Sequence, residues 1–247
     1  MLVRMDVALS IAGLPRGGPQ PWGDGTRTAL AWASGLGYRH VHLDGTAPDA
    51  RARDLSRSAR RDLAATLRRD GLVAAAIDLW IPPEHFALPA HAQRAVDAVT
   101  AAVGLASDLA LLADGTRVGV CTTLDPKTPA DLVDALAKDA AAKGVTLADH
   151  AWPPRASGGL GVGIDPAAIF ASGAEVVAGV TGLGRAPAAA RLSDLGPAGR
   201  VPPGDGRLDV LVYEGALSAV GYAGVLTLDL RHLRDPGATA RALAPTR

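Results

Sequence analysis

The sequence has few of the features that would link it to an oxidising compartment or to nucleic acid. Cys121 is the single cysteine among 247 residues, which excludes an internal disulfide and a zinc site built from several cysteines. Lysine plus arginine and aspartate plus glutamate number 25 each, so no net charge draws the chain towards nucleic acid or an anionic membrane. We therefore expect a reducing compartment and a small-molecule partner.

Aromatic residues and long apolar runs are also scarce. Aromatic residues make up 4% of the chain, which predicts an aliphatic core. No charged-then-apolar signal opens the sequence, and no apolar run approaches the roughly 18 residues of a membrane helix. These absences predict a cytoplasmic protein without a membrane partner.

What the sequence does have is a regular alternation of short apolar runs and longer helical segments, which is typical of βαβ units and a parallel sheet. The predicted strands cover residues 7–12, 40–43, 73–81, 117–122, 145–148, 160–164, 186–192 and 225–230. The predicted helices cover residues 26–36, 56–70, 89–105, 129–143, 166–172 and 209–220, with a short last helix after residue 231. A chain of 247 residues with this alternation predicts the α/β class and a single (β/α)8 TIM barrel over residues 1–247.

One helix of the predicted barrel is missing. The segment between the fifth and sixth predicted strands is too short for a crossover helix, which needs roughly 10–12 residues for the whole connection. It also contains Trp152-Pro153-Pro154, which is typical of a loop. We predict that helix five is reduced or absent.

Polar side chains follow most of the predicted strands. In a TIM barrel the chemistry lies at the C-terminal ends of the strands. The groups predicted at those ends are Asp44, Asp78, Trp80, Thr122, Thr123, Asp149, His150, Asp165, Arg191, Asp194 and Asp229. Carboxylates and an imidazole that converge on one rim are suitable ligands for a divalent metal.

The C-terminal part of the chain resembles a known family. Residues 204–209 read Gly-Asp-Gly-Arg-Leu-Asp, residues 221–224 read Gly-Tyr-Ala-Gly, and an apolar run then ends at Asp229. This order resembles the last βα unit of the xylose isomerase-like sugar isomerase and epimerase family, whose members are TIM barrels. The resemblance extends over most of the chain, from residues 35–39 (Gly-Leu-Gly-Tyr-Arg) to Asp229.

The resemblance implies a metal site with four ligands, three of which have counterparts here. Residues 160–167 look like the family's sixth strand, in which the aspartate, here Asp165, binds metal. The glutamate that normally ends the fifth strand falls on His150, or on Asp149 if the register slips by one. The last ligand is Asp229. The implied metal ligands are therefore His150, Asp165 and Asp229.

The fourth position departs from the family. Residues 190–194 read Ala-Arg-Leu-Ser-Asp where the family shows His-x-x-Asp, so Arg191 takes the place of a histidine ligand. Arginine keeps its proton and has no lone pair to donate, so it cannot ligate a metal. It can pair with Asp165 or Asp229, clamp a carboxylate or phosphate, or turn away to Asp194 or solvent. We predict the inward arrangement.

Two functions stay open. The family resemblance implies aldose–ketose isomerisation or epimerisation, assisted by Mn, Mg, Co or Zn, with Asp44 or Asp78 as catalytic base. The altered ligand set favours instead a catalytically inactive barrel that binds a small anionic or polyhydroxylated ligand through Arg191 and the rim carboxylates. Trp80 and His85 are predicted to bind the ligand as a pocket wall.

Some related barrels are multi-zinc DNA-repair endonucleases. Zero net charge and only six histidines disfavour that activity here.

The predicted site residues also have structural explanations. Asp165 precedes a proline at a helix start and is a candidate N-cap. Asp229 lies close to Arg231, and Asp44 and Asp78 are candidate partners for arginines.

Overall fold

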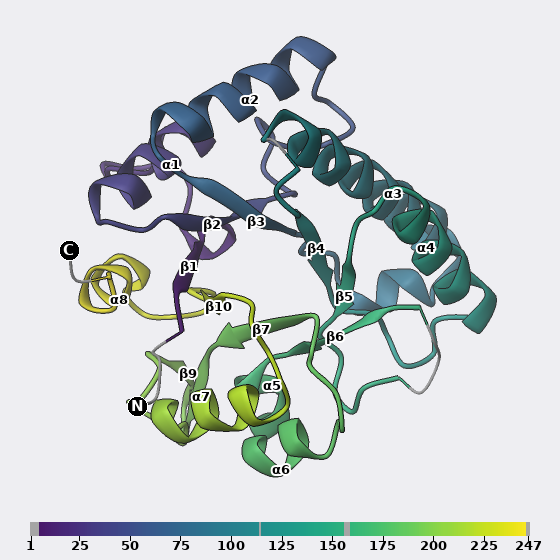
Figure 1. Ribbon diagram of the computed structural model, residues 1–247, viewed down its shortest axis with the longest axis vertical. Coiled ribbons are helices and arrows are strands. Elements are labelled where there is room, and N and C mark those ends of the chain that lie inside the picture. Colours follow the sequence, from purple (N-terminus) through teal and green to yellow (C-terminus); the bar gives the residue numbers. More distant parts are fainter. Residues whose placement is uncertain (1–4, 114, 156–158, 246–247) are drawn as a thin grey trace.

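The computed structural model describes residues 5–113, 115–155 and 159–245. Eight parallel strands close into a barrel in the order β1-β10-β7-β6-β5-β4-β3-β2. Figure 1 shows these strands around a common centre with the helices outside them. The barrel strands are β1 Val7–Ser10, β2 His40–Asp44, β3 Val73–Asp78, β4 Gly119–Thr122, β5 Leu147–Asp149, β6 Gly161–Ile164, β7 Ala189–Leu192 and β10 Leu226–Leu228. The predicted (β/α)8 TIM barrel is confirmed.

The helices lie outside this barrel, between consecutive strands. They are α1 Thr26–Gly35, α2 Arg57–Arg69, α3 Pro89–Leu112, α4 Ala130–Ala142, α5 Pro166–Ala171, α6 Val176–Thr181, α7 Val210–Ala219 and α8 Pro236–Ala242. Two 3-10 helices, η1 Ile11–Gly13 and η2 Pro83–Phe86, precede α1 and α3. The side chains of Ser56, Asp209 and Asp235 cap α2, α7 and α8 by accepting a backbone N–H from the first turn.

The predicted loss of helix five is confirmed for the part of the connection that the structure describes. Residues 150–155 and 159–160 between β5 and β6 contain no helix. The connection runs through Trp152 and the two prolines that follow it. Three residues of this connection, 156–158, lie outside the described range.

Two features after β6 are not predicted by the sequence pattern. Helix α6 follows α5, and an antiparallel hairpin of β8 Asp194–Gly196 and β9 Gly199–Val201 follows β7. The hairpin forms its own two-stranded sheet apart from the barrel. Strands of three residues are too short to show an alternating pattern, which explains why the sequence does not reveal them.

The glycine-rich segment after this hairpin binds a carboxylate of the chain itself. Asp194 accepts hydrogen bonds from the backbone N–H groups of Gly204, Gly206, Arg207 and Leu208, at 2.9–3.0 Å. A Cβ atom at Gly206 would lie 2.7 Å from Oδ1 of Asp194, so this position has no room for a side chain. The Gly-x-Gly motif thus anchors the hairpin to the start of α7.

Helix α3 corrects one expectation. By length and composition this 24-residue helix could cross a membrane, so the prediction that no apolar run approaches that length is wrong. In the barrel, α3 packs against α2, α4 and η2, and Val99, Val103 and Ala106 are buried. This is the pattern of a core helix.

Candidate functional site

Side chains from four barrel strands meet over the C-terminal end of the barrel. Asp78 ends β3, Arg191 lies on β7, and Asp165 and Asp229 directly follow β6 and β10. All four residues are at most 5% exposed. The sequence predicts that Arg191, Asp165, Asp229 and His150 converge here. Ion pairs join the first three, and His150 lies close enough for its pKa to respond to the charges of Arg191 and Asp165.

The guanidinium group of Arg191 points inward between two carboxylates. Its Nη1 is 3.3 Å from Oδ2 of Asp165, and its Nη2 is 3.4 Å from Oδ1 of Asp78. Burial lowers the pKa of Arg191, but the negative charges of Asp78, Asp229 and Asp165 raise it by more than burial lowers it. The pKa therefore lies above its usual value, and the group stays protonated. The predicted contact between Arg191 and a site carboxylate is confirmed.

Two more arginines hold the same carboxylates. Arg200, on β9 of the hairpin, places Nη2 2.6 Å from Oδ2 of Asp165 and Nη1 2.5 Å from Oδ2 of Asp229. Arg231 places Nε 2.7 Å from Oδ1 of Asp229 and makes a second contact with Oδ2 of the same carboxylate. One guanidinium therefore bridges Asp165 and Asp229, and the two carboxylates belong to a single site.

These contacts keep both aspartates ionised. Burial raises the pKa of Asp165, but the charges of Arg200 and Arg191 outweigh it and lower the pKa to about 2. Burial likewise raises the pKa of Asp229, and the charge and hydrogen bonds of Arg231, with the charge of Arg200, lower it well below its usual range. The two aspartates and three arginines form a network of buried ion pairs, which we call the arginine cluster.

The arginine cluster does not suit the divalent metal that the family resemblance implies. A metal would need carboxylate oxygens of Asp165 and Asp229, and arginine side chains already occupy them. Arginine cannot serve as a ligand, and its fixed charge repels a cation at short range in a buried site. The residues present therefore support no step through a metal.

His150 is the predicted metal ligand without an arginine partner. It is 3% exposed, and neither ring nitrogen has a hydrogen-bond partner among the described residues. Its ring lies against the backbone of Gly163, where a Cβ atom would come within 2.5 Å of the imidazole Cγ. Burial, together with the nearby charge of Arg191, lowers the pKa of His150 well below 6.5, so the ring is neutral.

The two predicted bases are both held by hydrogen bonds. Asp44 accepts from Nη2 of Arg16 at 2.8 Å and from the hydroxyl of Thr46 at 2.6 Å. Asp78 accepts from the hydroxyl of Ser10 at 2.5 Å in addition to its contact with Arg191. A catalytic role for Asp44 or Asp78 stays a prediction.

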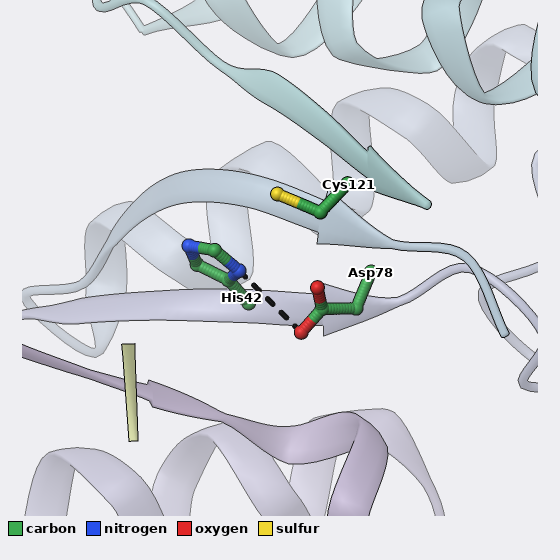
Figure 2. A group of neighbouring side chains, drawn as sticks. All are labelled: His42, Asp78 and Cys121. Carbon is green, nitrogen blue, oxygen red and sulfur yellow. Dashed lines mark ion pairs between the residues drawn. The ribbon is translucent and has the colours of Figure 1, made fainter. Parts of the chain in front are cut away.

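A second group of polar side chains is joined to the arginine cluster through Asp78. His42, Asp78 and Cys121 come from the neighbouring strands β2, β3 and β4, and Figure 2 shows them gathered inside the barrel. One potential ligand atom of each lies within 4.8 Å of the others. Nδ1 of His42 is 3.4 Å from Oδ2 of Asp78, and Nε2 is 2.9 Å from the hydroxyl of Thr227. These residue types could hold a metal, but Asp78 is already shared with Ser10 and Arg191.

An ion pair between protonated His42 and Asp78 explains why these side chains lie together, so no metal is needed. Burial lowers the pKa of His42, but the charge of Asp78 outweighs burial and raises it to about 10. The same pair, together with Arg191, holds the pKa of Asp78 well below its usual range despite burial. At the mouth itself three guanidinium groups, those of Arg191, Arg200 and Arg231, face the three carboxylates of Asp78, Asp165 and Asp229.

The protonated His42 makes stability depend on pH in the alkaline range. Its folded-state pKa of about 10 lies above the unfolded value of 6.5, so its stabilising contribution is complete below pH 6.5 and is lost as pH rises through 10. We expect the free energy of unfolding to fall by about 2–3 kcal/mol more in the wild type than in His42→Gln between about pH 7 and about pH 9.5. Urea unfolding at both pH values measures this difference. Equal losses in the two proteins would contradict a charged His42.

One of the predicted ligand-binding residues, Trp80, lies beside the arginine cluster. The guanidinium of Arg231 stacks over the ring of Trp80, and that of Arg191 lies 4.8 Å from the ring centre. Trp80 and His85 line one cavity of 310 Å³ between the segment after β2, the segment after β3 and α3. Arg191 does not line this cavity. Of the three predicted ligand-binding residues, Arg191 therefore lies at the mouth of the barrel, and Trp80 and His85 line an adjacent cavity.

Sequence reasoning missed Arg200 and the inward role of His42. Arg200 pairs with carboxylates that lie 29 and 35 positions away in the sequence, and it belongs to the hairpin that was not predicted. No local pattern marks it. A pattern in β2 could have revealed His42. Polar His40, His42 and Asp44 alternate with apolar Val41 and Leu43, and residues two apart in a strand point to the same face.

No family model matches this chain, and no curated protein matches it by sequence. Solved structures do match it. A xylose isomerase domain protein from Planctomyces limnophilus is 17% identical, with a TM-score of 0.70, over 97% of this chain and 93% of the other. A 3-keto-D-glucoside 4-epimerase from E. coli is 14% identical, with a TM-score of 0.69, over 97% of both chains.

A third similar structure contains a metal. A xylose isomerase-like TIM barrel protein from Mycobacterium smegmatis, solved in complex with magnesium, is 15% identical with a TM-score of 0.67. That match covers 96% of this chain and 94% of the other. Identities in this range show a shared fold. The resemblance to xylose isomerase-like barrels, predicted from the motifs near the C-terminus, is confirmed at that level.

Proposed function

We propose that this chain is a divergent sugar isomerase/epimerase-like barrel that has lost its metal site. In this proposal it binds a small anionic, polyhydroxylated ligand at the barrel mouth through its arginines. The observation that carries the proposal is the bridge of Arg200 between Asp165 and Asp229, together with Arg191 at the position of a histidine ligand. In this proposal the guanidinium groups of Arg191 and Arg200 provide the positive charge that a metal would otherwise provide.

The three guanidinium groups at the mouth support an anion as the ligand. Each is paired with a carboxylate of the chain itself, which an anionic ligand can replace. Guanidinium groups bind carboxylates and phosphates through paired, charge-assisted hydrogen bonds. An incoming anion would replace one aspartate contact of Arg200, whose side chain is 15% exposed and so is reachable from solvent.

Two further observations support hydroxyl groups on the ligand. The ring nitrogens of His150 have no partner among the described residues, and a neutral imidazole can both donate to and accept from a hydroxyl group. The similar structures include a keto-glucoside epimerase and xylose isomerase-like proteins. A sugar acid or a sugar phosphate combines the negative charge with the hydroxyl groups.

The alternative function is an active isomerase with an altered site. One observation favours it, namely that Arg200 reaches the mouth from a hairpin outside the barrel. If the hairpin moved away, Asp165 and Asp229 would each lose the contact with Arg200 and keep those with Arg191 and Arg231. Metal binding by the wild-type protein separates the two functions.

Calorimetry with D-gluconate, a sugar acid, and D-glucose, its neutral relative, tests the proposal. We expect gluconate to bind and EDTA to leave the affinity unchanged. Arg200→Gln should weaken gluconate binding by about tenfold or more, because a charge-assisted hydrogen bond contributes roughly 1.5–3 kcal/mol. Arg185→Gln, which changes an exposed arginine between α6 and β7, is the matched control and should change the affinity less than about twofold.

Three results would each overturn the proposal. Glucose could bind as tightly as gluconate, EDTA could abolish binding, or Arg200→Gln could behave like Arg185→Gln. The first would remove the role of charge, the second would restore the metal, and the third would place the ligand elsewhere.

A further inference from the structure

The cavity beside the barrel mouth has the composition of a separate ligand site. Its volume is 310 Å³, which lies at the lower end of the range for small-molecule sites, about 300–1,000 Å³. Trp80 forms part of its wall and at the same time contacts Arg191 and Arg231. None of the three arginines of the arginine cluster lines the cavity, so the cavity and the mouth are adjacent but distinct.

The floor and walls of the cavity are apolar. The segment after β3 contributes Leu79, Ile81 and Pro82, and α3 contributes Ala95 and Ala98. The alanines on this side of α3 leave the surface open, where larger side chains would fill the cavity. A flat apolar group can lie against Trp80 and these small side chains.

The rim of the cavity is cationic. Arg51, Arg53 and Arg94 line it, and no aspartate or glutamate does. Arg51 and Arg53 share a single carboxylate, Asp54, at 3.2 and 3.8 Å. Arg94 is exposed, and no ion pair holds it among the described residues. The rim therefore has positive charge without a matching carboxylate.

Two histidines complete the cavity. The rings of His85 and His91 stack with their centres 4.5 Å apart, and both residues line the cavity.

We propose that this cavity is a second binding site, for a small molecule with a flat apolar body and one anionic head group. The body lies against Trp80, Leu79 and Ala98, and the carboxylate or phosphate head lies at the rim between Arg53 and Arg94. This assignment does not rest on the function proposed for the mouth. A polyhydroxylated ligand would leave its hydroxyl groups unpaired against the apolar floor, so the two sites select different chemistry.

Phenyl phosphate is the probe that combines both features of this ligand. Benzyl alcohol supplies the apolar body without the charge, and inorganic phosphate supplies the charge without the body. We expect phenyl phosphate to bind with a Kd below about 1 mM and at least tenfold more tightly than either fragment. Isothermal titration calorimetry measures all three affinities on the full chain.

Variants locate the bound probe. Arg94→Gln should weaken phenyl phosphate binding at least fivefold, and Ala98→Phe, which fills the cavity, should abolish it. Arg185→Gln should leave the affinity unchanged. Arg200→Gln removes an arginine of the mouth and should also leave it unchanged, which distinguishes this site from the mouth.

The proposal is overturned if phenyl phosphate does not bind or if benzyl alcohol binds equally well. It is also overturned if Arg94→Gln changes the affinity no more than Arg185→Gln does. Loss of binding in Arg200→Gln but not in Arg94→Gln would assign the anion to the mouth instead. Circular dichroism of each variant confirms that it is folded.

Discussion

The double variant Arg191→His/Arg200→Gln is expected to bind Mn²⁺ at least about 100-fold more tightly than the wild type, equal to about 2.7 kcal/mol. The first change adds an imidazole where the arginine now stands, and the two changes together remove both close arginine partners of Oδ2 of Asp165. They also remove two fixed positive charges from the space that the metal would occupy. His150 and Asp165 can then join the new imidazole as ligands, while Asp229 keeps its contacts with Arg231.

Calorimetric titration with Mn²⁺, before and after treatment with EDTA, measures this change. The single variant Arg191→His should show a smaller gain, because Arg200 and Arg231 still hold the carboxylates. Arg185→Gln serves as the control for loss of one positive charge. If the wild type binds Mn²⁺ with micromolar affinity and the double variant binds no better, the mouth is a working metal site and the active-isomerase alternative replaces our proposal.

Removing one carboxylate from the arginine cluster should cost far more stability than removing one from the surface. Asp229→Asn is expected to lower the free energy of unfolding by about 3–5 kcal/mol, because it removes the main carboxylate partner of Arg231 and leaves Arg200 with Asp165 alone. Asp229 is 3% exposed, so the lost contacts lie in a largely buried site. The expected loss is a large fraction of the 5–15 kcal/mol that stabilises a typical domain.

Urea unfolding of the purified variant gives this value directly. The control is Asp54→Asn, which breaks the exposed pairs with Arg51 and Arg53 and should cost less than about 1 kcal/mol. A loss for Asp229→Asn as small as that of the control would mean that the cluster is well solvated. In that case its arginines would not be fixed in the arrangement described above.

The barrel could be predicted from the sequence because most strands are short runs rich in apolar residues that alternate with helical segments. Seven of eight residues expected on eight different strands lie on them, and the eighth, Val118, directly precedes β4. The seven are Val7, Val41, Ala75, Leu147, Val162, Ala190 and Leu226. The additional helix α6 and the β8–β9 hairpin could not be predicted. Their elements are three to six residues long, and so short a segment shows no reliable period.

The site could be predicted in part. The inward position of Arg191 follows from the cost of burying an unpaired guanidinium at a strand end where carboxylates gather. The participation of Arg200 does not follow from any local pattern, because an arginine on a hairpin outside the barrel can pair with any carboxylate within its reach. The same limit applies to the cavity at Trp80, since three separate segments form it and only the fold brings them together.

The position of Cys121 gives the chain a built-in reporter of barrel opening. This sole cysteine is 2% exposed and lies on β4 among the side chains inside the barrel. A thiol reagent can reach its sulfur only when neighbouring strands separate or the chain unfolds. The rate at which the native protein is labelled therefore measures how often the barrel opens, and no engineered probe is needed. Because Cys121 lies close to Asp78, which pairs with Arg191, this labelling rate would also register any ligand or substitution that tightens or loosens the mouth.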